Sequence, residues 1–156
     1  MELRLMRLGL GDRDRARALF RLMAAVFEEE CQPLSDRYLD GLLGRREFWA
    51  IAALVGEQIV GGITAHTLPM TRSESFEIFI YDVAVQEEQQ RKGIGRELLN
   101  RLRAEAAAVG IGELFVPADD EDLHALDFYR ALGGVAARVT IFSFSSSVAS
   151  EAMPKR

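Results

Sequence analysis

The segment from Ser75 to Gln86 constrains the fold of this chain more than any other. Its apolar residues are Phe76, Ile78, Phe79, Ile80, Tyr81, Val83, Ala84 and Val85. Because they occupy both alternating faces of an extended chain, the segment predicts a central strand that is covered on both sides. A carboxylic acid, Asp82, lies inside this predicted strand. The chain is therefore expected to fold around a sheet that carries an acid in its interior.

Apolar periodicity predicts further strands and helices on either side of this segment. The expected elements are a strand over 2–8, a helix from 11 to 30, a short helix from Ser35 to Gly44, a hairpin of 48–55 and 59–68, a helix over 93–109, a strand over 114–116, a helix over 123–132 and a last strand over 139–144. Strands and helices mix without an internal repeat, which is typical of an α+β protein. We expect one domain over 1–145 and a flexible tail over 146–156.

Composition limits the classes of partner. The chain has 156 residues, 49% of them hydrophobic and 28% charged, which fits one globular domain. Its formal net charge of −5 argues against a nucleic-acid partner, because neutralising phosphates requires a surplus of Lys and Arg. An acidic protein instead suits a cationic partner.

Membrane and metal sites find no support in the sequence. The longest wholly apolar run, 48–55, is too short to cross a bilayer, and residues 1–15 lack the apolar stretch of a secretory signal. We therefore expect a cytoplasmic protein without a membrane partner. His66 and His124 have no third ligand at a metal-site spacing, so no metal is predicted.

The segment from Gln90 to Gly95 joins the predicted central strand to the helix over 93–109. A helix start presents backbone N–H groups and the positive end of the helix dipole to an anion. The glycines and basic residues here are Gly93, Gly95, Arg91, Lys92 and Arg96. A dinucleotide fingerprint is excluded because Leu98 stands where its third glycine belongs, and no Walker A motif occurs. The pattern predicts a pyrophosphate site; the alternative is an ordinary turn with solvated basic residues.

Two motifs resemble those of the GNAT superfamily of acyl-coenzyme A dependent N-acetyltransferases. The pyrophosphate motif of that superfamily, Gln/Arg-x-x-Gly-x-Gly/Ala, matches 90–95, and its later aromatic-Tyr pair followed by Leu-Gly matches 128–133. The chain looks most like the aminoglycoside 3-N-acetyltransferases of the gentamicin-modifying type, over 60–68, 77–85 and 115–120. The resemblance implies a GNAT fold, with a mixed, mostly antiparallel sheet of about six to seven strands flanked by about four helices.

The resemblance also implies acetyl-CoA as co-substrate and a homodimeric assembly. The backbone of Val83, Ala84 and Val85 would pair with the pantetheine arm as an added strand. The residues expected to bind the pyrophosphate are Gln90, Arg91, Lys92, Gly93, Ile94, Gly95 and Arg96.

Asp82 and Tyr129 are the candidate catalytic residues. Burial in an apolar strand raises the proton affinity of Asp82, which would bind the substrate ammonium and accept its proton. The alternative for Asp82 is a structural acid held by backbone N–H groups. Tyr129 would protonate the leaving thiolate, as the family pattern implies; the alternative is a ring packed on the core with its hydroxyl in water.

Two acidic segments are candidates for binding a cationic substrate. Glu28, Glu29 and Glu30 end the first predicted helix, where three acids oppose the helix dipole. Asp119, Asp120, Glu121 and Asp122 follow the strand over 114–116. The alternatives are a solvated surface for the first segment, and for the second a solvated loop in which Asp122 caps the next helix.

The expected function is acetyl-CoA dependent N-acetylation of an aminoglycoside, at the 3-amino group of the 2-deoxystreptamine ring, by direct attack in a ternary complex. One alternative is acetylation of another amine, either a polyamine or a protein amino group. The other is a non-catalytic module that senses acyl-CoA. Cys31 lies beside three glutamates, which makes it a poor candidate for a nucleophile and disfavours an acyl-enzyme route.

Overall fold

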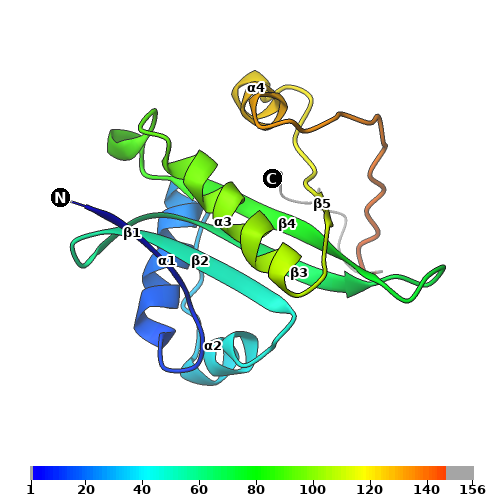
Figure 1. Ribbon diagram of the computed structural model, residues 1–156. Helices are drawn as coiled ribbons and strands as arrows, with labels where there is room; N and C mark the ends of the chain where they lie inside the picture. The colour runs from blue at the N-terminus through cyan, green and yellow to red at the C-terminus, as the bar shows by residue number, and fades with distance from the viewer. Residues whose placement is uncertain (1, 147–156) are drawn as a thin grey trace. The chain divides into compact units, whose positions relative to one another are not determined.

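The computed structural model describes residues 2–146. The chain divides into two compact units, Met1–Pro117 and Ala118–Arg156. Within the first unit lies a five-stranded sheet in the order β1-β2-β3-β4-β5 (Figure 1). Its strands are β1 Leu3–Arg7, β2 Phe48–Val55, β3 Gln58–Pro69, β4 Phe76–Val85 and β5 Glu113–Phe115. The first four strands pair antiparallel, and β5 runs parallel to β4. The predicted central strand is therefore confirmed as β4, between β3 and β5.

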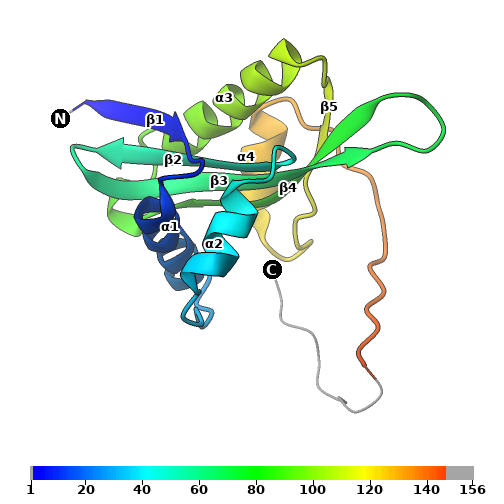
Figure 2. The same cartoon turned by 90° about the horizontal axis from the view of Figure 1, so that it is seen from below.

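Helices cover both faces of this sheet (Figure 2). The helices of the first unit are α1 Arg13–Val26, α2 Asp36–Leu43, the 3-10 turn η1 Glu87–Gln89 and α3 Ile94–Ala108. Leu19 of α1 and Leu39 of α2 are fully buried in one cluster with alternate residues of β2. Leu98 and Leu102 of α3 are fully buried on the opposite face. This double burial explains why β2 and β4 carry apolar residues at successive positions.

A β-bulge interrupts the pairing of β3 with β4. Thr64 lies opposite Asp82, whereas the next residue, Ala65, lies opposite Ile80. Tyr81 is therefore the extra residue that the bulge inserts. A bulge turns two consecutive side chains toward the same face of a sheet. Tyr81 and Asp82 consequently both face the side on which α1 and α2 pack.

The second unit contains α4, Leu123–Ala131. Residues 132–146 follow it without a helix or strand. The predicted last strand over 139–144 is therefore wrong, and within residues 2–146 the sheet has five strands rather than the expected six to seven. Alternating apolar residues make a segment suited to a strand, but a strand also requires a neighbour to complete its ladder. Here the side chains of Ile141 and Phe144 are 72% and 92% exposed.

Several predicted boundaries shift by a few residues. The first helix ends at Val26, so Glu28–Glu30 follow it rather than form its last turn. The second helix is confirmed between Ser35, whose hydroxyl accepts from the Tyr38 N–H, and Gly44. The single domain over 1–145 stays a prediction, and most of the predicted tail, from residue 147, lies outside the described residues. Among the described helices none is long and apolar enough to span a membrane.

Candidate active site

Asp82 occupies the second position of the bulge in β4, half-buried in an apolar sheet. Burial, followed by the nearby negative charge of Glu29, raises the pKa of its carboxyl to about 6. A carboxyl with this pKa is ionised at neutral pH and still holds a proton more strongly than an ordinary aspartate. The position therefore suits a group that binds an ammonium and accepts its proton.

The end of α1 brings Glu29 toward Asp82. The Glu29 N–H donates to the Ala24 carbonyl oxygen at 2.8 Å, and the Glu28 N–H donates to the Ala25 carbonyl oxygen at 3.2 Å. These two bonds form a Schellman motif, in which the residue at the position of Glu28 adopts a left-handed conformation. Glu28 has φ of 56°, where glycine is the favoured residue. The motif ends α1, and the charge of Glu29 immediately after it acts on Asp82.

Glu28→Gly is expected to raise the free energy of unfolding by about 1 kcal/mol, because glycine adopts this conformation without strain and the change removes a negative charge from the helix C-terminus. Urea unfolding measures the change. Glu30→Gly is the matched control: it removes the same charge nearby at a residue without positive φ, and it should not stabilise the protein. Equal effects of the two substitutions would contradict the assignment of strain to Glu28.

The glycine loop enters α3 through two left-handed residues, Arg91 with φ of 64° and Gly93 with φ of 83°. In the described chain no side chain caps the start of α3, so its first backbone N–H groups stay available to an anion. Ile94 is buried, which restricts it to backbone contacts with a ligand, whereas Arg91, Lys92 and Arg96 are exposed. The loop therefore fits a diphosphate in both backbone geometry and charge.

Gln90 fixes this loop to the end of β4. Its side-chain Nε2 donates to the Val85 carbonyl oxygen at 2.9 Å. Lys92 is similarly tied to the loop, because its Nζ donates to Oε1 of Gln89 at 3.1 Å. The side chain of Gln90 thus positions the loop, while its predicted direct contact with pyrophosphate stays a prediction.

The edge of β4 beside β5 is only partly paired. The ladder with β5 covers Glu77–Phe79 and stops there. Within residues 2–146, the segment Val83–Val85 pairs with β3 on one side and with no strand on the other. An extended ligand can add to such an edge through backbone hydrogen bonds. This is the edge that leads to Gln90 and the glycine loop.

In the second unit two of the four acids already have local roles. Asp122 caps α4 as predicted, since its Oδ1 accepts from the Ala125 N–H at 3.1 Å. Asp119 accepts from the Glu121 N–H at 2.9 Å through its own Oδ1. The ring centres of Tyr129 and Phe128 lie 5.1 Å apart. The roles of Tyr129 as acid and of Asp119–Glu121 as substrate ligands stay predictions.

Sequence reasoning missed the ring side chains beside Asp82. His66 and Tyr81 lie with their ring centres 5.8 Å apart, and the register places His66 on the face of Thr64 and Asp82. Burial, followed by the charge of Arg45, lowers the pKa of His66, so its imidazole is neutral at neutral pH. A strict alternation of faces along β4 would put Tyr81 and Asp82 on opposite sides, and only the bulge brings them together.

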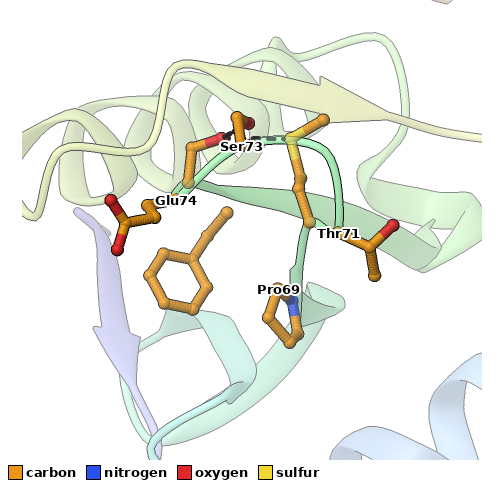
Figure 3. A pocket seen from close by; sticks show the side chains of 7 residues that line it. Pro69, Thr71, Ser73 and Glu74 are labelled. Carbon is orange, nitrogen blue, oxygen red and sulfur yellow. Dashed lines mark hydrogen bonds between the residues drawn. The ribbon is translucent and has the colours of Figure 1, made fainter.

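A separate pocket lies in the hairpin between β3 and β4 (Figure 3). Its volume is about 460 Å³, and seven residues of the hairpin line it, among them Pro69, Thr71 and Glu74. By strand register it lies several residues along β4 from Asp82. Among the described residues no group of three or more His, Cys, Asp and Glu side chains is arranged to hold a metal ion.

Comparison with known proteins identifies the class. Residues 16–133 match the acetyltransferase (GNAT) family, and the chain belongs to that family. It is therefore an acyltransferase, and the family uses acetyl-CoA. No curated protein sequence matches the chain.

Two solved aminoglycoside acetyltransferases from uncultured soil metagenomic samples are close structural neighbours. The first, meta-AAC0020, is 35% identical, with a TM-score of 0.88 in a complex with trehalose and 0.87 in a complex with sisomicin; 92% of this chain and 95% of that chain are covered. The second, HMB0005, is 32% identical with a TM-score of 0.88, covering 94% of this chain and 100% of the other. The structure of AAC(6')-Iy with a bisubstrate analogue of CoA is 14% identical, covers 93% of this chain and 99% of the other, and shares the fold, with a TM-score of 0.77.

Proposed function

We propose that this protein transfers the acetyl group of acetyl-CoA to an amino group of an aminoglycoside, at the 3-amino position of the 2-deoxystreptamine ring. The observation that carries the proposal is the half-buried Asp82, with a pKa of about 6, beside Glu29. Two neighbouring carboxylates, Asp82 in β4 and Glu29 after α1, suit a polycationic acceptor. The soil acetyltransferase that was solved with sisomicin supports an aminoglycoside as that acceptor.

The residues divide the chemistry between binding and proton transfer. Asp82 holds the acceptor ammonium and accepts its proton, directly or through water, so that the neutral amine attacks the thioester carbonyl. The exposed edge at Val83–Val85 takes the pantetheine arm, and the amides that begin α3 hold the pyrophosphate. Tyr129 donates a proton to the departing thiolate. The products are an acetamide and free coenzyme A, and no acyl-enzyme is formed.

The experiment is a thiol-release assay with purified protein, acetyl-CoA and a panel of amines. Gentamicin-type aminoglycosides should release free thiol, and mass and NMR analysis of the product should place the acetyl group on the 3-amino nitrogen. Release with spermidine or a peptide amine alone would contradict the aminoglycoside proposal and favour the alternative acceptors. Binding of coenzyme A without any release would favour a sensing module. The cytoplasmic location and the homodimer stay predictions.

A further inference from the structure

A row of aromatic side chains crosses the sheet at one register position. Phe48 of β2 lies opposite His66 of β3, His66 lies opposite Phe79 of β4, and Phe79 lies opposite Phe115 of β5. Residues opposite one another share a face, so these four rings stand on the side where α1 and α2 pack. We call Phe48, His66, Phe79, Phe115 and the adjoining Tyr81 the aromatic ladder.

The rings of the aromatic ladder contact one another in sequence. The ring centres lie 5.3 Å apart for Phe48 and His66, and 5.2 Å apart for the stacked pair of Phe79 and Phe115. Tyr81 joins these two pairs, with its ring centre 5.8 Å from His66 and 5.9 Å from Phe79. The bulge that aims Asp82 also aims Tyr81, so the ladder and the candidate base share one face.

The aromatic ladder is buried at one end and open at the other. Phe48 is 6% exposed in the core, whereas Phe115 is 45% exposed at the edge of the sheet. Sheet stability accounts for the buried end, since cross-strand ring pairs stabilise neighbouring strands. It does not require an exposed phenylalanine stacked on Phe79 at the edge, because leaving apolar surface in water gains nothing for folding.

We infer that the open end of the aromatic ladder, at Phe79 and Phe115, stacks against a saccharide ring of the acceptor and determines the enzyme's preference for cyclic aminosugars over linear polyamines. This inference rests on the proposed function. A pyranose ring presents a flat C–H face that packs on an aromatic ring, and its ammonium groups lie at the rim. The neutral imidazole of His66 adds no repulsion to a cationic ligand.

The charge at Asp82 and Glu29 alone would accept any polyamine. A linear polyamine carries its charges on a thin flexible chain and has no ring face to stack. A cyclic aminosugar satisfies both features, with an ammonium at Asp82 and a ring over Phe115. Asp82 follows Phe79, the stacking partner of Phe115, by three residues in β4, and three residues of a strand span about 10 Å. An oligosaccharide of two or three rings is long enough to reach both the carboxylate and the exposed ring.

The experiment compares Phe115→Ala with Phe76→Ala in the full chain. Phe76 is the matched control, because it is a phenylalanine at the start of β4 and is 51% exposed. It lies two residues before the buried Ile78 and therefore shares the face of Ile78, which is opposite to the face of the aromatic ladder. Phe115→Ala should raise the KM for sisomicin about fivefold to tenfold, with the KM for acetyl-CoA and the inhibition constant of spermidine unchanged. Phe115→Tyr keeps an aromatic ring and should have the wild-type KM for sisomicin. Phe76→Ala should also have the wild-type KM for sisomicin.

The outcomes separate the two proposals. Thiol release by the wild type with an unchanged KM for sisomicin in Phe115→Ala would overturn the inference and leave the proposed function standing. Absence of thiol release with every aminoglycoside would overturn the proposed function. In that case calorimetric titration of sisomicin still tests the aromatic ladder: weaker binding to Phe115→Ala than to Phe76→Ala supports it, and equal affinities, or no binding to the wild type, overturn it. An equal rise in the inhibition constant of spermidine would also overturn it, because a general loss of binding is not specificity for a ring.

Discussion

Asp82→Asn is expected to lower kcat/KM for the amine acceptor by a factor of about 10² to 10⁴, because the amide can neither accept the ammonium proton nor attract its charge. The KM for acetyl-CoA should change little, since the diphosphate site lies on the loop before α3. Steady-state thiol release measures both constants. Glu47→Gln is a control for charge, because it removes one exposed carboxylate from a residue with no assigned role.

The same substitution should not destabilise the fold. The raised pKa of Asp82 means that the native state binds a proton more tightly than the unfolded chain, so this carboxyl lowers stability as pH rises from about 4 to about 6. An asparagine side chain does not ionise, so the Asp82→Asn variant avoids this decrease in stability. At pH 8 it should unfold at a urea concentration equal to or higher than that of the wild type. Residual activity near the wild-type level, or activity lost together with the fold, would contradict the role of base.

Gly62→Ala is expected to lower the free energy of unfolding by about 2–3 kcal/mol and Tm by about 6 °C. A Cβ at this position would lie 2.4 Å from Cδ1 of Leu19 and 2.9 Å from the Ile51 carbonyl oxygen. Leu19 is fully buried, so it has little room to move aside. The glycine thus allows α1 to approach β3 closely enough for the acids after α1 to reach the face of Asp82.

Gly41→Ala is expected to change the free energy of unfolding in the opposite direction to Gly62→Ala. Gly41 lies inside α2, where a Cβ would meet nothing within 4 Å. Alanine should raise the free energy of unfolding by about 0.5–1 kcal/mol, because it restricts the unfolded chain and favours the helix. Thermal unfolding of the two variants checks both signs. A Gly62→Ala variant as stable as the wild type would mean that α1 does not need its close approach to β3.

Much of the fold could be predicted from local pattern. The apolar run of β4, the hairpin before it and the stripe of α3 follow directly from the period of their side chains. The segment over 139–144 shows where this reasoning stops. Alternation describes the faces of a strand, but pairing depends on a neighbour elsewhere in the chain, and no periodicity encodes that neighbour.

The candidate site was predictable in its residue types and less so in its geometry. Burial of Asp82 followed from its apolar flanks, and the anion site followed from the glycines before α3. The proximity of Glu29 depends on a Schellman turn with a glutamate where glycine is usual, and the orientation of Tyr81 depends on a bulge. Both are backbone irregularities that arise from tertiary packing, so single-sequence patterns do not reveal them.

The pH dependence of kcat/KM for one aminoglycoside, compared between wild type and Glu29→Gln, tests the account most directly. The wild-type rate should fall as pH drops through about 6, because protonation of Asp82 removes the base. Removing the charge of Glu29 should lower the pKa of Asp82 and so shift this fall in kcat/KM to lower pH. Any change in rate that comes from titration of the acceptor's own amine should occur at the same pH in both proteins. A fall in kcat/KM below neutral pH that occurs at the same pH in both proteins, or a wild-type rate that stays constant down to pH 5, would contradict the assignment of Asp82 as the base beside Glu29.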